Sequence, residues 1–343
     1  MSETPTQAPN THGSDHTPKH RPFFWSKKLH AATPKLANKL SLASAASVIT
    51  AQSVAYSPFL ATFGATKIAA QKLPDVPLLG KLGKLSDRAI IRIADLWVNN
   101  NNYLIDRLLP EKDWRIRLPM DLSPNKKYLL ICNHQSWVDT SIIQYVSEGR
   151  LPLTRFFAKH ELLYIPIVGQ AFYLLDFPMM KRPSKKAVAK NPKLLGRDLA
   201  EAKRACQMLM DKPFVLLNYL EGTRFTKKKH TLQNSPYQHL LKPKAGGFAL
   251  ALSSLGAQID GILDMTIVYP DGVPEYNELW AGKLTRLGVD IRPIQMDEAL
   301  FSALKSGGYH GDDGAVKEAL HAWLDATWQA KDERIGQMLA EFL

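Results

Sequence analysis

A histidine and an aspartate five positions apart form the most reactive pattern in this chain of 343 residues. His134 comes directly after the apolar run 128–132 and Asn133, and Asp139 lies in the segment that follows. On an ideal helix, positions five apart point about 140° away from one another. The two side chains therefore meet only if His134 precedes a helix and Asp139 lies in its first turns. Asp139 would then accept from one ring nitrogen and leave the other as a general base, whereas a solvated loop contact is the alternative interpretation.

A second polar turn follows another apolar run, residues 214–220, and reads Glu221, Gly222, Thr223 and Arg224. Gly222 permits a tight bend and a close approach of the backbone to a ligand. Arg224 offers a planar set of donors suited to phosphate or carboxylate, and Thr223 adds a hydroxyl. Glu221 is expected to hold Arg224 or to receive a substrate hydroxyl. A surface turn with a Glu–Arg ion pair is the alternative.

In this order and at this separation, the two motifs resemble the signatures of the glycerolipid acyltransferases, the family that includes 1-acylglycerol-3-phosphate acyltransferase. The resemblance covers about residues 85–335 and includes the stretches 157–169, 172–182, 241–248 and 266–271. The sequences of residues 177–182 and 267–271 are most similar to those of the bacterial YihG-type branch. The stretch 172–182 lacks the family's usual arginine after its aspartate-like position, so the phosphate-binding role passes to Lys181 or Arg182.

The resemblance implies transfer of a fatty acyl group from an acyl thioester to the free hydroxyl of a lysophospholipid, most simply lysophosphatidic acid. His134 is then the general base, oriented by Asp139. Because a thioester is already electrophilic, the enzyme needs only a base and positive groups near the oxyanion and the acceptor phosphate. Backbone N–H groups at the helix start after His134 would supply part of that positive charge. The residues implied to bind substrate are Glu221, Gly222, Thr223, Arg224, Lys159, Lys181 and Arg182.

Several aspects of this reaction stay open in the sequence. Acyl-coenzyme A and acyl carrier protein present the same thioester, so either can be the donor, and no cofactor or metal is expected. Lysophosphatidylglycerol or another lysophospholipid is the alternative acceptor. A thioesterase or lipase-type hydrolase that uses the same dyad is the alternative from another class.

The net charge of +12 predicts an anionic partner. Basic residues cluster between 181 and 193 and again at 227–229. Such clusters attract anionic membrane surfaces, by about 1 kcal/mol per basic residue near the headgroups, and also coenzyme A phosphates or an acidic carrier protein. Nucleic acid is not expected, because no recognition-helix, zinc-finger or aromatic RNA-binding signature accompanies the clusters.

The remaining composition excludes several classes of enzyme. Two cysteines, Cys132 and Cys206, form no disulfide framework, which fits a cytosol-facing catalytic part. The spacing of cysteines and histidines supports no zinc site. The absence of a Gly-x-Ser-x-Gly turn and of a glycine-rich phosphate loop argues against an ordinary serine hydrolase and a nucleoside triphosphatase.

Three parts are expected along the chain: a disordered polar segment 1–32, a membrane-associated segment 33–80, and an acyltransferase domain 81–343 that ends in a docking helix. Residues 40–66 carry no charge but are rich in small residues. We expect two short helices in the cytoplasmic leaflet, bent at Pro58, with Lys39 and Lys67 at headgroup level. A weak spanning helix and a hairpin packed on the soluble core are the alternatives. The expected location is the cytoplasmic face of a bacterial inner membrane.

The elements that position the two motifs alternate between strand-like and helix-like patterns. Such alternation predicts an α/β fold, with a mixed, mostly parallel sheet flanked by helices (glycerol-3-phosphate acyltransferase-like) and an N-terminal membrane-associated helical hairpin. Both motifs then fall at the carboxyl ends of strands, where such sheets form their ligand crevice. The predicted strands are 114–118, 128–132, 155–158, 172–175, 214–219, 265–269 and 289–293, and the predicted helices are 85–109, 136–146, 194–210, 246–255 and 316–343.

Overall fold

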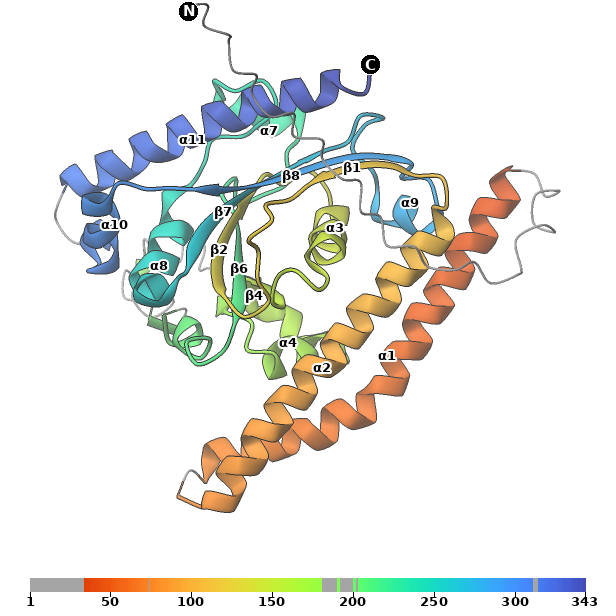
Figure 1. The fold of residues 1–343 in the computed structure, drawn as a ribbon, viewed down its shortest axis with the longest axis vertical. Helices are drawn as coiled ribbons and strands as arrows, with labels where there is room; N and C mark the ends of the chain where they lie inside the picture. The colour runs from red at the N-terminus through yellow and green to blue at the C-terminus, as the bar shows by residue number, and fades with distance from the viewer. Residues whose placement is uncertain (1–33, 74, 181–189, 192–199, 202, 311–313) are drawn as a thin grey trace, which may run out of the picture. The chain divides into compact units, whose positions relative to one another are not determined.

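The computed structural model describes residues 34–343 except 74, 181–189, 192–199, 202 and 311–313 (Figure 1). The contacts within the chain separate residues 1–37 from residues 38–343, and the packing below is that of the second unit. The segment 1–32, predicted to be disordered, lies outside the described residues. Most of the first half of the predicted helix 194–210 also lies outside the described residues. Residues 203–207 of its second half are helical.

A mixed sheet forms the centre of the second unit and confirms the predicted fold class. In the described residues its six strands are ordered β1-β8-β7-β2-β6-β3, and all neighbours are parallel except the pair β7–β8. A separate pair, β4 with β5, is also parallel. The strands are β1 (Asp113–Arg117), β2 (Lys127–Cys132), β3 (Thr154–Phe156), β4 (Ala158–Lys159), β5 (Met179–Met180), β6 (Phe214–Tyr219), β7 (Gly261–Val268) and β8 (Arg286–Ile294).

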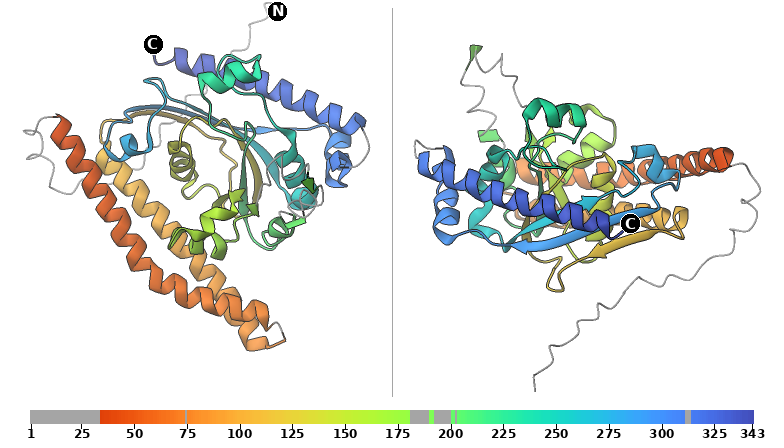
Figure 2. Two further views of the ribbon diagram at one scale, coloured as in Figure 1. Left: turned by 180° about the vertical axis from the view of Figure 1, so that it is seen from behind. Right: turned by 90° about the horizontal axis from the view of Figure 1, so that it is seen from above.

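Helices cover both faces of the sheet because the strand side chains alternate between two apolar layers. In β2, Leu130 and Cys132 pack in the layer of α3 (Val138–Ser147) and α9 (Tyr276–Trp280). Leu129 and Ile131 pack in the opposite layer, which contains α8 (Ala245–Leu255), α10 (Glu298–Lys305) and α11 (Gly314–Ala340). Figures 1 and 2 show these two sets of helices on opposite sides of the sheet. The shorter described elements are α4 (Val168–Leu174), α7 (Lys227–Gln233) and the 3-10 turns His160–Tyr164, Gly256–Gln258 and Gly308–His310.

The predicted strand 172–175 is wrong, because residues 168–174 form helix α4. Its apolar side chains pack with Ile90 and Phe177 in a small third cluster beside the sheet. A run of four apolar residues fits a buried helical turn as well as a strand, so its pattern did not distinguish the two. The predicted strand 155–158 is interrupted, since β3 ends at Phe156 and β4 begins at Ala158.

The N-terminal hairpin is present, but its two arms are not the predicted ones. Helix α1 (Pro34–Lys72) is continuous and contains Pro58, and α2 (Pro77–Leu108) returns antiparallel beside it (Figures 1 and 2). The predicted bend at Pro58 is therefore wrong. Proline lacks the N–H that would bond the Val54 carbonyl, and the Ser57 hydroxyl donates to that carbonyl instead, at 2.8 Å. None of the described helices is long and apolar enough to cross a bilayer.

Polar side chains join the hairpin arms to one another and to the sheet. The Lys67 ammonium, predicted at headgroup level, is instead buried and donates to Asp87 on α2 at 2.7 Å and to Asp176 at 2.9 Å. Lys212 donates to the same two carboxylates, at 2.8 and 2.6 Å. A buried ammonium requires such partners because its desolvation is costly. The network therefore fixes α1 and α2 to the segment that precedes β6.

Candidate active site

The sheet places His134 and Asp139 as their spacing requires. Strand β2 ends at Cys132, His134 lies in the following turn, and Asp139 lies in the first turn of α3. The imidazole Nδ1 is 2.8 Å from Asp139 Oδ2. The Asp139 side chain is 1% exposed and that of His134 is 15% exposed. The carboxylate is therefore enclosed, while part of the imidazole remains open to a substrate.

Asp139 receives hydrogen bonds from four groups. Its Oδ2 also accepts from the N–H groups of Gln135 and Ser136, at 2.7 and 3.0 Å, and its Oδ1 accepts from the Tyr269 hydroxyl at 2.6 Å. These donors stabilise the ionised carboxylate. An ionised Asp139 keeps the proton of His134 on Nδ1, which leaves Nε2 free to accept one.

Three of the N–H groups at the helix start are not available for the role that the sequence suggested. Those of Gln135 and Ser136 are engaged by Asp139, and that of Val138 donates to the Ser136 hydroxyl at 3.1 Å. These three groups are therefore occupied within the turn. In this turn, the N–H of Trp137 has no acceptor among the described residues.

A tyrosine fixes the plane of the imidazole. Tyr219 is the last residue of β6, the strand beside β2, and its ring stacks on His134 with 3.9 Å between centroids and 15° between planes. Burial raises the pKa of the Tyr219 phenol well above its usual value, so the ring stays neutral. The stack restricts rotation of the imidazole away from Asp139.

Glu221 connects the two motifs through the backbone. It is fully buried, and its two oxygens accept from the N–H groups of His134, at 2.7 Å, and Leu241, at 3.1 Å. The Phe225 N–H donates to the His134 carbonyl at 2.7 Å. The expected ion pair between Glu221 and Arg224 is therefore wrong. The expectation that Glu221 receives a substrate hydroxyl is also wrong, because its side chain is fully buried. Burial raises the pKa of Glu221 to about 8.

Arg224 extends from this loop to the surface beside the dyad. Its guanidinium lies 4.7 Å from the ring centroid of Trp137, which is 61% exposed and precedes α3. No carboxylate of the described residues forms an ion pair with Arg224. A stacked, unpaired guanidinium keeps its edge donors available for an anion.

The shape of the Arg224 loop depends on Gly222 and Lys229. Gly222 has φ of 66°, a left-handed conformation that favours glycine, and an added Cβ would lie 3.0 Å from the Lys244 ammonium. The Lys229 ammonium donates to the Thr223 hydroxyl at 2.7 Å and to the Arg224 carbonyl at 2.9 Å. Lys229 thus holds the loop, although its sequence context suggested only a basic surface cluster.

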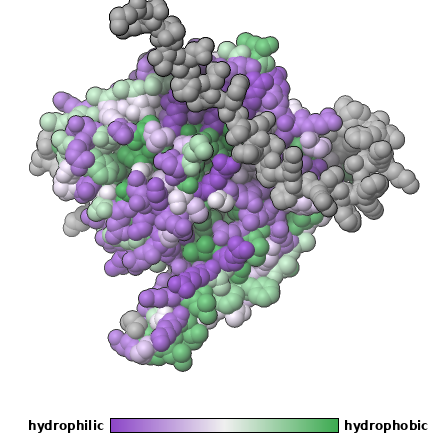
Figure 3. Space-filling view, in the orientation of Figure 1, coloured by the Kyte–Doolittle hydropathy of each residue, from purple (hydrophilic) through white to green (hydrophobic). Residues whose placement is uncertain are grey.

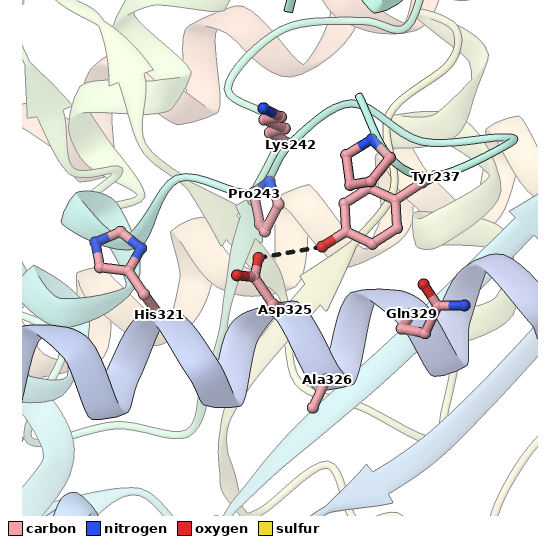
Figure 4. A pocket seen from close by; sticks show the side chains of 8 residues that line it. Tyr237, Lys242, Pro243, His321, Asp325, Ala326 and Gln329 are labelled. Atoms are coloured by element: carbon pink, nitrogen blue, oxygen red, sulfur yellow. Dashed lines mark hydrogen bonds between the residues drawn. The ribbon is translucent and has the colours of Figure 1, made fainter. Parts of the chain in front are cut away.

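The other predicted binding residues are not brought to the dyad by described contacts. Lys159 is exposed in β4, and no hydrogen bond or ion pair within the described segments joins it to His134, Asp139 or Arg224. Lys181 and Arg182 lie outside the described residues. Two hollows of the described surface lie elsewhere. One, of about 620 Å³, lies between residues 236–243 and α11 (Figure 4), and the other, of about 310 Å³, lies beside α2.

The chain is similar to known acyltransferases. The family model described as Acyltransferase matches residues 114–270, which include both motifs. The human 1-acyl-sn-glycerol-3-phosphate acyltransferase delta is 25% identical over 217 residues, 60% of this chain and 51% of the human protein. The Arabidopsis thaliana 1-acyl-sn-glycerol-3-phosphate acyltransferase 2 is 26% identical over 226 residues, 61% of this chain and 55% of the plant protein. The chain thus spans about half the length of these curated relatives.

One solved structure is similar over most of its length. It is the 1-acyl-sn-glycerophosphate acyltransferase PlsC from Thermotoga maritima, with 16% identity and a TM-score of 0.46. The match covers 89% of this chain and 98% of that one.

Proposed function

Residues 114–270 belong to the acyltransferase family, and on this premise we propose that the chain transfers a fatty acyl group from an acyl thioester to lysophosphatidic acid, forming phosphatidic acid. The observation that carries the proposal is the connection between the two motifs. The His134–Asp139 dyad and the Arg224 loop come from different strands, and Glu221 holds them together through the His134 backbone. A base and an anion-binding group therefore lie together at the carboxyl ends of β2 and β6.

The dyad supplies the base for the transfer. Nε2 of His134 accepts the proton of the acceptor hydroxyl as its oxygen attacks the thioester carbonyl. The tetrahedral intermediate then expels the thiolate, which receives the proton from Nε2, and the oxygen ester remains. Asp139 stays ionised and stabilises the imidazolium that forms between the two steps. The Trp137 N–H is the donor that we assign to the oxyanion.

The acceptor phosphate is assigned to the loop around Arg224. Its guanidinium presents parallel donors that match a phosphate, and Gly222 and Thr223 shape the loop that carries it. Lys159, Lys181 and Arg182 stay proposed contributors to the same charge. The similarity to the YihG-type branch stays a prediction. The preference for one acceptor headgroup, which Lys181 and Arg182 would set, also stays a prediction.

The thioester donor is acyl-coenzyme A or acyl carrier protein, and we propose that the hairpin rests on the cytoplasmic face of a bacterial inner membrane. Apolar surface follows the hairpin in Figure 3. The largest exposed apolar side chains there include Val54, Phe59, Leu78 and Leu85. Exposed Lys81, Lys84 and Arg88 lie on the same hairpin. Apolar and basic side chains together suit an anionic bilayer surface.

An acceptor-omission assay tests the reaction. The full chain is given a labelled acyl thioester alone, then with lysophosphatidic acid, lysophosphatidylglycerol or monoacylglycerol. We expect rapid appearance of labelled phosphatidic acid and little release of free fatty acid without an acceptor. Equal thioester cleavage with and without acceptors would instead identify a hydrolase. Preference for lysophosphatidylglycerol would change the proposed acceptor and leave the proposed acyl transfer in place.

A further inference from the structure

Tyr269 occupies a position at the dyad that neither motif contains. It follows the last residue of β7, the neighbour of β2 on the side opposite β6, and it is buried. Its hydroxyl donates to Asp139 Oδ1 at 2.6 Å, whereas His134 and two backbone N–H groups bond to Oδ2. Among the described residues, Tyr269 is the single donor to Oδ1.

A hydrogen-bond donor on Oδ1 of Asp139 changes the charge on Oδ2 of the same carboxylate. The phenol draws negative charge toward Oδ1 and opposes rotation of the carboxylate. The charge that remains on Oδ2 sets how strongly Asp139 stabilises a protonated imidazole. Tyr269 therefore acts on His134 through Asp139, although it does not touch the imidazole in any described contact.

We propose that Tyr269 is a positioning residue for acyl transfer: its hydroxyl holds the Asp139 carboxylate against His134 and limits how tightly the imidazole keeps its proton. The kinetic part of this inference rests on the proposed function. The effect on the imidazole itself does not, because it follows from the hydrogen bonds alone. A base that released its proton too slowly would delay protonation of the departing thiolate.

Other titratable groups surround the dyad, and they decide which measurement is informative. Burial raises the pKa values of Cys132, Tyr219 and Tyr269 well above their usual range, so these three groups stay neutral near pH 7. Burial raises the pKa of Glu221 to about 8, so this carboxyl group titrates near neutral pH. The charged groups near the dyad also include Arg224, which stacks on Trp137, and Asp264 of β7, which forms buried ion pairs with Lys331 and Arg334 of α11. A pH–rate profile alone would therefore include the titration of Glu221.

Nuclear magnetic resonance of the full chain labelled with ¹⁵N-histidine reads the imidazole directly and without substrate. The His134 signal is assigned by its loss in His134→Ala. In Tyr269→Phe, we expect the His134 titration midpoint to rise by about half a pH unit or more, because the carboxylate regains charge on Oδ2. The acid limb of kcat/KM should move in the same direction, while KM for the acceptor stays unchanged.

Tyr237→Phe is the matched control. Tyr237 is 5% exposed against 6% for Tyr269, and its hydroxyl also donates to an aspartate, Asp325 of α11, at 3.1 Å. That pair lies at the hollow of Figure 4, and no described contact joins it to the dyad. The His134 midpoint should not move in this variant.

An unchanged His134 midpoint in folded Tyr269→Phe would overturn the inference. If that variant does not fold, a fluorinated tyrosine at position 269 keeps the packing and strengthens the donor. It should lower the midpoint, and no change there would be equally decisive. A wild-type chain without acyl transfer would refute the proposed function and leave this titration result standing.

Discussion

Acyl transfer by His134→Ala is expected to fall by about 100- to 10,000-fold, since a positioned general base contributes that much to the rate. The structure also predicts that the variant stays folded. Glu221 and Phe225 bond the backbone N–H and C=O of position 134, and an alanine keeps both groups. The measurement is the initial rate of labelled phosphatidic acid formation, together with chemical denaturation.

His321→Ala provides the matched control for this loss. His321 is exposed on α11 and lines the hollow of Figure 4, so its removal should leave the rate and the stability near those of the wild type. Turnover at the wild-type rate by a folded His134→Ala protein would contradict the base assignment. An unfolded variant would instead show that the imidazole stack on Tyr219 matters for stability.

Arg224→Ala should raise KM for lysophosphatidic acid by about 10- to 100-fold, because a hydrogen bond to a charged group is worth about 1.5–3 kcal/mol. Arg224→Lys should lie between the wild type and alanine. It keeps the charge but loses the planar donor set and the stack on Trp137. Steady-state kinetics with the acceptor varied at a saturating acyl thioester measure the effect.

Two controls make the Arg224 result specific to phosphate. Lys228→Ala removes an exposed cation from the neighbouring helix α7 and should change KM little. With monoacylglycerol, which lacks a phosphate, the wild type and Arg224→Ala should behave alike. An equal loss with both acceptors would assign Arg224 to the oxyanion or to the loop structure instead of the phosphate.

Much of the sheet could be predicted because its central strands β2, β6 and β7 are buried on both faces. The runs at 128–132 and 214–219 are almost entirely apolar, and each ends in a polar motif. The extent of both strands, and the place of the motifs at their carboxyl ends, therefore followed from the sequence. The separation of His134 and Asp139 likewise required a turn before a helix. Local patterns therefore specified the dyad and the strand ends that carry it.

Most of the errors arose where contacts outside the local pattern decide the structure. Pro58 stays within a helix because Ser57 supplies the missing donor and α2 packs alongside. Lys67 is buried because Asp87 and Asp176, far away in the sequence, meet it. Glu221, which follows β6, is buried because it accepts a hydrogen bond from the backbone N–H of His134, which follows β2. The order of the strands, which no local pattern reveals, brings Tyr219 and Tyr269 to either side of β2.

The most direct test of the account is an experimental structure of the full chain with lysophosphatidic acid bound. We predict that the phosphate contacts the Arg224 guanidinium and that the free glycerol hydroxyl lies about 3 Å from His134 Nε2, within reach of proton transfer. A bound acceptor whose hydroxyl lies remote from that nitrogen, with its phosphate away from the 221–224 loop, would contradict it.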